Sequence, residues 1–318
     1  MAYFPNKTST GGDGIWKLRD FSKYIQANNF PGIGNAIFGF GFDGLTNFGS
    51  NLNTITRFDN TGTYVGSEET AGTARHALAA ASYGVDKAIF GFGYITARVN
   101  TITRFDHTGT YVGSEETAGT TSRYPAAASY GSDKAIFGYG NGGNTITRFD
   151  NTGVYVGSEE TAGTARNYPA AASYGGDKAI FGFGFQSNTI TRFDNTGTYV
   201  GSEETAGTAR YYLAAASYGG DKAIFGFGYS SLGGTFTRVN TITRFDNTGV
   251  YVGSEENAGT ARYGLAAASY GGDKAIFGYG DTSALVNTIT RFDNTGAYVD
   301  YEDTAGTARR YLAAASYG

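Results

Sequence analysis

The chain contains no cysteine and very little histidine, proline, tryptophan or methionine: its 318 residues include two His, four Pro, one Trp and one Met. Without cysteine, disulfides, thiolate nucleophiles, Cys-ligated zinc and iron–sulfur clusters are excluded. The net charge of −4 argues against a surface that tracks nucleic acid. No apolar run reaches the ~18–20 residues of a membrane-spanning helix. Residues 1–14 lack the pattern of a Sec-type secretory signal, so neither a leader nor an anchor is expected.

Glycine and aromatic residues are abundant instead, with 50 Gly, 25 Tyr and 23 Phe, and they belong to an internal repeat. The hexapeptide Asn-Thr-Ile-Thr-Arg-Phe occurs six times, with its arginine at Arg57, Arg104, Arg148, Arg192, Arg244 and Arg291. Two further motifs, Ala-Ile-Phe-Gly-(Phe/Tyr)-Gly and Ala-Ala-Ser-Tyr-Gly, also occur six times each. The chain is therefore organised as six copies of one unit.

Each unit has four short segments of strand-like sequence separated by glycine-containing turns. In the unit that begins at Ala77, the expected strands cover residues 77–83, 87–93, 100–106 and 110–112. The Asp-His-Thr-Gly connection at residues 106–109 suits a short hairpin with glycine in the left-handed conformation. No unit has helical periodicity, so the repeat is predicted to be all β.

Four-stranded units that recur every ~40–50 residues are typical of propeller blades. We therefore predict an all-β, six-bladed β-propeller with the small Ala-Ala-Ala-Ser segments around its axis. In the second strand of each unit, Phe92 and its equivalents are expected to seat against glycines of the neighbouring blade. A linear solenoid is the alternative arrangement.

The first and last units lack complementary parts. Residues 35–41 have the sequence of a second strand without a first strand before them, and residues 312–317 have the sequence of a first strand. Pairing these two segments completes a sixth blade and removes two unpaired edges. We therefore assign residues 35–318 to a propeller closed by pairing of its N- and C-terminal strands.

The run from Ala209 to Gly228 resembles the first two strands of a kelch repeat. It contains Ala-Ala-Ala at residues 214–216 and Gly-Asp-Lys-Ala-Ile-Phe-Gly-Phe-Gly at residues 220–228. Gly-Phe-Gly stands in place of the kelch double glycine, and Tyr251 occupies the region where kelch repeats usually carry tryptophan. The resemblance covers residues 35 to 318, and the style of the repeat is similar to that of kelch-type repeats encoded by bacteriophages and environmental bacteria. Residues 14–31 resemble short segments of phage tail and structural proteins. These resemblances imply a kelch-like propeller and a structural role in a virion.

Residues 1–34 lie outside the repeat and are predicted to form an N-terminal arm with a short helix. Asp13 can cap a helix from about Gly14 to Ala27. Apolar side chains at helical spacing, flanked by aromatic rings, form one face. The predicted docking residues are Trp16, Leu18, Phe21, Tyr24 and Ile25. Two alternatives follow: the arm plugs its own propeller, or it docks on another subunit with the tryptophan as its anchor.

Catalysis needs a unique set of groups, and most ionisable residues here are repeated. Six arginines equivalent to Arg57, six in the series of Arg75 and the recurring Glu-Glu pairs are expected to form ion pairs between blades or a solvated rim. His76 and His107 are single substitutions in different units, without partners for a metal site or a Ser-His-Asp arrangement. We therefore predict a protein that is not an enzyme and holds no metal and no cofactor.

Differences among the six copies concentrate in the loop between the second and third strands and in the approach to the first strand. In an up-and-down blade these connections emerge on one face, which predicts an irregular rim rich in aromatic and polar side chains. The candidate ligand or partner residues are Phe42, Phe48, Tyr94, Arg98, Tyr124, Tyr168, Phe185, Tyr211, Tyr229, Phe236, Arg238 and Arg310. Such side chains suit sugar rings or a protein partner. The alternative is that these loops vary because loops tolerate change.

Two functions compete. The first is a structural, adhesive protein of a phage particle, associated with its tail or fibre, whose rim binds a host-surface glycan or protein. Residues 1–34 would then dock on other virion subunits. The second is a self-assembling extracellular filament or coat, a homo-oligomer joined through the N-terminal arm. A carbohydrate-active enzyme is disfavoured by the missing chemistry. Both favoured functions place the protein in a virion or outside the cell, without nucleic-acid binding or membrane insertion.

Overall fold

The structure, a computed structural model, describes residues 34–44, 49–230 and 235–318. Every regular element in these residues is a β-strand and none is helical, so the prediction of an all-β repeat is confirmed. Among the same residues there is accordingly no helix of the length and apolarity that crossing a membrane requires. The predicted N-terminal helix, its docking residues Trp16, Leu18, Phe21, Tyr24 and Ile25, and the rim residue Phe48 lie outside the described residues.

The described residues form four-stranded antiparallel sheets, numbered 1 to 6 in chain order of their outer strands. Sheet 1 contains β27 (Ala313–Tyr317), β1 (Asn35–Phe42), β2 (Asn51–Phe58) and β3 (Tyr64–Thr70); sheet 2 contains β4 (Ala79–Tyr83), β5 (Lys87–Gly91), β6 (Val99–Phe105) and β7 (Tyr111–Ser122); sheet 3 contains β8 (Ala126–Tyr130), β9 (Lys134–Gly138), β10 (Thr145–Phe149) and β11 (Tyr155–Thr161). Sheet 4 contains β12 (Ala170–Tyr174), β13 (Lys178–Gly184), β14 (Ser187–Phe193) and β15 (Tyr199–Thr205); sheet 5 contains β17 (Ala214–Tyr218), β18 (Lys222–Gly226), β21 (Thr241–Phe245) and β22 (Tyr251–Asn257); sheet 6 contains β23 (Ala266–Tyr270), β24 (Lys274–Gly278), β25 (Thr288–Phe292) and β26 (Tyr298–Thr304). A small three-stranded sheet is formed by β16 (Arg210–Tyr211), β19 (Tyr229–Ser230) and β20 (Thr237–Arg238).

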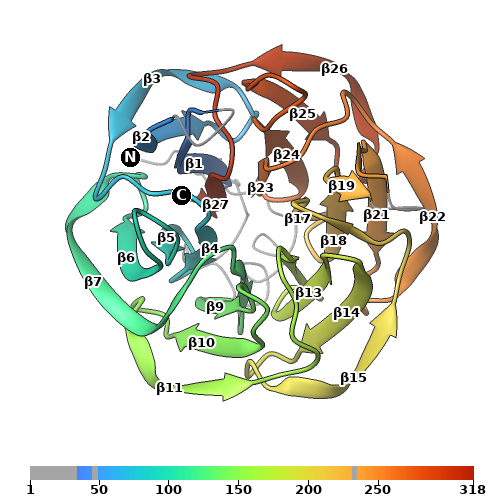
Figure 1. Ribbon diagram of the computed structural model, residues 1–318, viewed down its shortest axis with the longest axis horizontal. Coiled ribbons are helices and arrows are strands. Elements are labelled where there is room, and N and C mark those ends of the chain that lie inside the picture. The colour runs from blue at the N-terminus through green and yellow to red at the C-terminus, as the bar shows by residue number, and fades with distance from the viewer. Residues whose placement is uncertain (1–33, 45–48, 231–234) are drawn as a thin grey trace, which may run out of the picture.

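The sheets are arranged around a common centre, with β3, β7, β11, β15, β22 and β26 at the periphery (Figure 1). The innermost strands contact each other in the cyclic order β4, β8, β12, β17, β23, β27 and back to β4. This arrangement is compatible with a propeller. We call the contact between two neighbouring sheets a seam and name it by its sheets, as in seam 2/3.

The two ends of the repeat region meet in sheet 1. β27 pairs antiparallel with β1, and the register places Ala36 opposite Ser316 and Phe38 opposite Ala314. The pairing supplies β1 with hydrogen-bond partners on both sides, since β2 pairs along its other edge. Sheet 1 is therefore assembled from segments almost a full chain length apart.

A ring of hydrogen bonds joins the six innermost strands. In each, the hydroxyl of the Ala-Ala-Ala-Ser serine donates to the backbone carbonyl of the equivalent serine in the preceding sheet, over 2.8–2.9 Å. The donor and acceptor pairs are Ser82–Ser316, Ser129–Ser82, Ser173–Ser129, Ser217–Ser173, Ser269–Ser217 and Ser316–Ser269. The small Ala and Ser side chains thus let the strands approach closely enough for each sheet to be bonded to the next.

Glycine and phenylalanine meet at every seam. A Cβ atom added at Gly226 would lie 2.7 Å from Ile242 Cδ1 and 3.2 Å from Phe277 Cε1, so only glycine accommodates the ring of the next sheet. The equivalent pairs are Gly39–Phe90, Gly91–Phe137, Gly138–Phe181, Gly182–Phe225, Gly226–Phe277 and Gly278–Phe38. These rings are fully buried or nearly so, and each hydrophobic cluster spans two neighbouring sheets.

The predicted ring for this contact was wrong. Phe92 was expected to seat on the neighbouring glycine, whereas Phe90 and its equivalents do so. Phe92 has a φ of 66°, in the left-handed region, which breaks the alternation of side chains just beyond the end of β5. Its ring packs instead on the ring of Phe137, with the centroids 5.4 Å apart.

The turn between the third and fourth strands forms as predicted. In sheet 2, Asp106 Oδ1 accepts hydrogen bonds from the backbone N–H of Thr108 and Thr110 and from the Thr108 hydroxyl. Gly109 has a φ of 74°, the left-handed conformation expected for it. The strands of this unit begin and end within two residues of the predicted bounds, except that β7 continues to Ser122.

Candidate functional site

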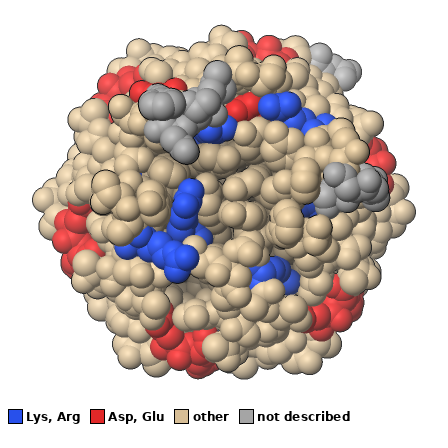
Figure 2. Space-filling view, viewed as in Figure 1, with Lys and Arg blue, Asp and Glu red and all other residues tan. Residues whose placement is uncertain are grey.

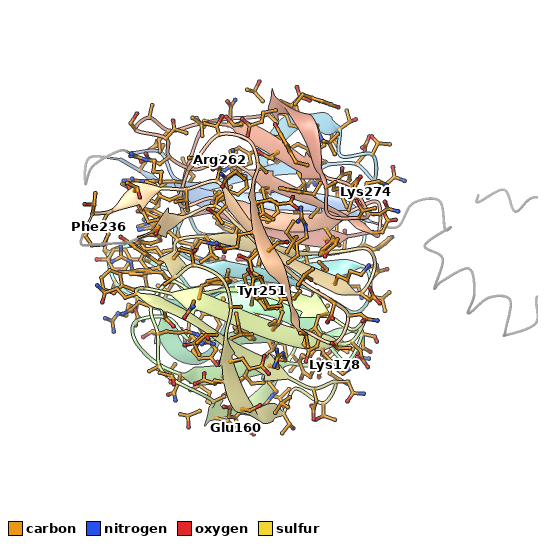
Figure 3. All side chains as sticks on the ribbon, turned by 90° about the vertical axis from the view of Figure 1, so that its right-hand side faces the viewer. Glu160, Lys178, Phe236, Tyr251, Arg262 and Lys274 are labelled. Atoms are coloured by element: carbon orange, nitrogen blue, oxygen red, sulfur yellow. The ribbon has the colours of Figure 1, made fainter. Side chains whose placement is uncertain are left out.

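The two variable segments of a repeat lie together on one face of the molecule. His76, before β4, forms a β-bridge with Tyr94, after β5, and Phe42 does the same with Arg310 in sheet 1. Figure 3 is turned by 90° from Figure 1, and its left side, where Phe236 is labelled, is the face seen in Figures 1 and 2. Figure 2 therefore shows the face that carries the variable segments. There, Lys and Arg lie nearer the centre and most of the Asp and Glu lie near the edge. We call this face the rim face.

At the centre of the rim face, the residues two positions before the six innermost strands converge on a narrow mouth. These residues are Ala77, Tyr124, Tyr168, Tyr212, Gly264 and Tyr311, and all six have positive φ angles of 53–66°. The ring centroids of Tyr168 and Tyr212 are 4.2 Å apart, and those of Tyr124 and Tyr311 are 5.4 Å apart. The cluster lines an open pocket of about 90 Å³. We call it the tyrosine mouth.

Backbone hydrogen bonds also join residues of the tyrosine mouth to one another. The Ala77 N–H donates to the Tyr311 carbonyl over 2.8 Å, and the Tyr311 N–H donates to the Gly264 carbonyl over 2.7 Å. Burial raises the pKa of Tyr212 and Tyr311 well above the ordinary value, and the neighbouring tyrosines add to the shift. The phenols therefore stay neutral and can donate hydrogen bonds at physiological pH.

Tyr124 and Tyr168 were predicted rim residues, and both line the tyrosine mouth. The site list drawn from the sequence omitted Tyr212 and Tyr311. An alignment of the six units could have identified them, because they stand at the same position of the repeat as Tyr124, two residues before the alanine run.

A second aromatic cluster lies beside the small three-stranded sheet. Tyr211 packs on Phe185 at 5.2 Å and on Tyr229 at 5.7 Å between centroids. Phe185 and Phe236 stack nearly parallel, with centroids 6.4 Å apart and planes inclined by 25°. These two rings are 42% and 51% exposed, whereas Tyr211 is buried. The structure therefore brings four predicted residues together and presents two of them to solvent.

Arg238 and Arg310, both predicted rim residues, hold a buried carboxylate. Arg310 Nη1 lies 2.8 Å from Asp281 Oδ2 and 2.6 Å from the Tyr263 hydroxyl oxygen, and Arg238 Nη2 lies 3.2 Å from Asp281 Oδ1. Asp281 is 3% exposed and Arg310 is 8% exposed. Arg310 thus has a structural role within the rim, because a buried charge without its partner would be costly.

His76 lies between aromatic rings beside the tyrosine mouth, with its ring centroid 6.2 Å from that of Tyr311. Its ring centroid is 5.1 Å from that of Phe42 and 5.5 Å from that of Tyr94, and its Nδ1 lies 2.6 Å from Asn51 Oδ1. Burial lowers the pKa of His76 to about 4, with a further contribution from nearby arginines. The imidazole is therefore neutral at physiological pH and acts as a packed hydrogen-bonding group.

The repeated arginines equivalent to Arg57 connect neighbouring sheets through a backbone carbonyl, whereas their ion pairs, predicted to join neighbouring blades, lie within one sheet. Arg244 Nε and Nη2 donate to the carbonyl of Gly296 in the next sheet over 3.0 and 2.7 Å, and Nη2 also bonds Glu256 over 2.9 Å. The same contact recurs around the ring, including Arg291 in sheet 6 to Gly62 in sheet 1. These charges are part of the seams.

The series of Arg75 was miscounted from the sequence. Its members are Arg75, Arg166, Arg210, Arg262 and Arg309, which are buried in five seams. In the sixth seam this position is Ser122, and Arg123 is one residue further on, at the position of His76. Arg123 lies over the ring of Tyr94 at 4.5 Å, on the rim face.

No cluster of three or more His, Cys, Asp or Glu side chains capable of holding a metal ion occurs among the described residues. His107 is exposed. No family model matches the chain, and no curated protein is significantly similar to it. The kelch resemblance therefore depends on the repeat residues themselves.

Proposed function

We propose that the chain is a non-catalytic binding protein whose six sheets are the blades of a kelch-like β-propeller, closed where β27 pairs with β1. The cyclic contacts of the inner strands and the ring of serine hydrogen bonds support this fold. In such a propeller, the irregular connections of one face form the recognition surface, and the regular strands are the scaffold.

The observation that carries the proposal is the exposed pair of Phe185 and Phe236. Two large apolar rings stacked on each other in solvent are costly for a scaffold, and a single exposed ring is the ordinary case. Tyr211 packs on both rings of the pair and Tyr229 packs on Tyr211, so the rings are held in place before a ligand arrives. A flat, fixed aromatic platform with neighbouring hydroxyls suits a sugar ring or a protein side chain.

We further propose that the protein belongs to a virion, as a tail or fibre component that binds a glycan or protein of the host surface. This step depends on the resemblance of the repeat to kelch-type repeats of phage structural proteins. Residues 1–34 would join it to other virion subunits or to further copies of itself. Electron microscopy of the purified full chain tests the simple adhesive role, because filaments grown from this chain alone would favour the alternative of a self-assembling coat.

A glycan array and a host-cell binding assay test the recognition surface directly. The double variant Phe185→Ser/Phe236→Ser should lose binding, whereas Val112→Ser should not, because Val112 is 54% exposed but lies on the outer strand β7. Both variants should melt like the original protein, since the replaced side chains are exposed. Equal binding by the double variant and the control would contradict a function for the rim.

A further inference from the structure

Five of the six seams contain the same buried-arginine site, which Arg262 in seam 5/6 illustrates (Figure 3). Arg262 Nη1 bonds Glu302 over 2.8 Å, and Nη2 bonds the Thr290 hydroxyl oxygen over 2.7 Å. The guanidinium lies over the ring of Phe227, with 4.4 Å between Cζ and the ring centroid. The side chain is completely buried. One aromatic ring, one glutamate and one threonine thus form a pocket that fits a guanidinium.

The same partners recur in four other seams. The arginine–glutamate pairs are Arg75–Glu115, Arg166–Glu203, Arg210–Glu255 and Arg309–Glu68, with N–O distances of 2.8–3.6 Å. The rings beneath these four guanidinium groups lie 4.1–4.6 Å away and belong to Phe40, Tyr139, Phe183 and Tyr279. The site is therefore a constant feature of the repeat.

Seam 2/3 retains the pocket but lacks the arginine. Ser122 stands at the position of Arg262, and its carbonyl accepts the Gly93 N–H over 2.9 Å, as the Arg262 carbonyl accepts the Gly228 N–H over 2.9 Å. This backbone hydrogen bond is thus the same in the two seams, although β7 continues to Ser122 whereas β22 ends at Asn257. The ring, the threonine and the glutamate of the pocket are present as Phe92, Thr147 and Glu159.

These groups line a cavity of about 200 Å³. That is smaller than the ~300–1,000 Å³ of most small-molecule pockets and suits a single functional group. Arg98 and Thr121 are exposed and also line it, so the cavity opens to solvent.

Glu159 is held ready for a cation. Its carboxylate accepts the Thr120 N–H over 2.8 Å, the Thr120 hydroxyl over 2.6 Å and the Thr147 hydroxyl over 2.9 Å. Burial alone would raise the pKa of Glu159, but these hydrogen bonds outweigh it and keep the pKa below the ordinary value. Among the described residues, no lysine or arginine nitrogen lies within 4 Å of this carboxylate, unlike the glutamates of the other five seams.

We propose that the cavity of seam 2/3 is a binding site for a guanidinium group supplied from outside the chain. The ligand would stack on Phe92, pair with Glu159 and donate to the Thr147 hydroxyl, repeating the contacts of Arg262 in seam 5/6. Its source is either a small guanidine compound or an arginine side chain of a partner protein. This inference goes beyond the proposed recognition role of the exposed aromatic rings and does not depend on it.

Isothermal titration of the full chain with methylguanidinium chloride at constant ionic strength tests the site. We expect one binding site in the original protein and none in Ser122→Arg, whose new side chain fills the cavity. Glu159→Gln should weaken binding at least tenfold, because it removes the charge and keeps the shape. Methylammonium, which lacks the planar fork of donors, should bind at least tenfold more weakly than methylguanidinium. A capped Gly-Arg-Gly peptide distinguishes the sources: it binds as well as methylguanidinium only if the mouth admits an arginine side chain.

Arg98 provides a decisive control, since it lies at the mouth of the cavity. If Arg98→Ala binds methylguanidinium and the original protein does not, the occupant is Arg98 itself and the proposal is overturned. Equal binding by the original protein and Ser122→Arg would also overturn it, because the ligand would then lie elsewhere. Circular dichroism of each variant shows whether it is folded. If Ser122→Arg does not fold, Ser122→Gln replaces it and should reduce the affinity.

Discussion

Seams 5/6 and 2/3 share their glycine–phenylalanine contact, their Arg57-type arginine bridge and their threonine-held glutamate, yet one contains a buried arginine and the other a cavity. Gly226 meets Phe277 in the first as Gly91 meets Phe137 in the second. The two seams therefore differ in a group that the fold does not need in order to form. The scaffold is carried by contacts repeated in every seam, so one departure from the repeat can leave a pocket without destroying the sheets.

The comparison assumes that both seams belong to one cooperative ring, and the largest expected effect comes from opening it. Deletion of residues 313–318 removes β27, so β1 loses one partner and the serine ring is interrupted. The single unfolding transition should be lost or strongly shifted in calorimetry. The control Ser316→Ala removes one hydroxyl and should cost only about 1 kcal/mol. An unchanged melting curve for the deletion would show that the sheets are independent.

Removing the buried arginine side chain from seam 5/6 should give the next largest effect. Arg262→Ser leaves Glu302 without its buried partner and creates a cavity, which should destabilise the protein by about 3–5 kcal/mol. The matched change in the vacant seam, Ser122→Ala, should alter the unfolding free energy by less than about 0.5 kcal/mol. Urea unfolding of both variants measures the difference. Similar values for the two would mean that Arg262 is not part of what holds its seam together.

Replacing the seam glycine should cost different amounts of stability in seams 5/6 and 2/3. Gly226→Ala places a Cβ against Ile242 and Phe277 in a filled seam and should cost about 1–3 kcal/mol. Gly91→Ala should cost less, because Phe137 lines the cavity and has room to shift. If urea unfolding gives the same loss of stability for both variants, the cavity does not allow Phe137 to shift.

The smallest expected effect is a change in the pKa of His76 on replacing Arg123, which follows Ser122 in the sequence. Burial, then the positive charges of Arg123 and Arg310, lower the pKa of His76 from 6.5 to about 4. Because the folded pKa is below the unfolded one, His76 contributes stability that is present above pH 6.5 and lost as the pH falls towards 4. Arg123→Gln should raise the pKa of His76 modestly, and the stability contributed by His76 should then be lost over a narrower pH range. NMR titration measures it, with exposed His107 as internal reference; an unchanged pKa would remove Arg123 as a cause.

The sequence predicted the all-β repeat and its strand bounds well, because alternation, glycine turns and sixfold repetition all indicate the same elements. It mispredicted the ring at the seam, since the left-handed backbone at Phe92 breaks the alternation on which the prediction relied. Most rim residues were predicted from variability alone, and this method has a clear limit. Variability identified Arg310 as a surface contact, whereas its side chain is buried on Asp281.

The vacant seam could have been found from the sequence but was hidden by a shift of one residue. Arg123 is adjacent to Ser122 and was counted with the series of Arg75. A strict alignment of the six units would have separated the two positions. That the vacancy is a cavity beside a charged glutamate depends on the packing of sheets 2 and 3, which the sequence does not specify.

The most direct test of the account moves the vacancy from one seam to the other. In the double variant Ser122→Arg/Arg262→Ser, seam 2/3 is filled and seam 5/6 is emptied. If guanidinium binding is set by the missing arginine, the folded double variant should again bind one equivalent of methylguanidinium, although Ser122→Arg alone binds none. A folded double variant that binds none, while the original protein binds one, would contradict the account.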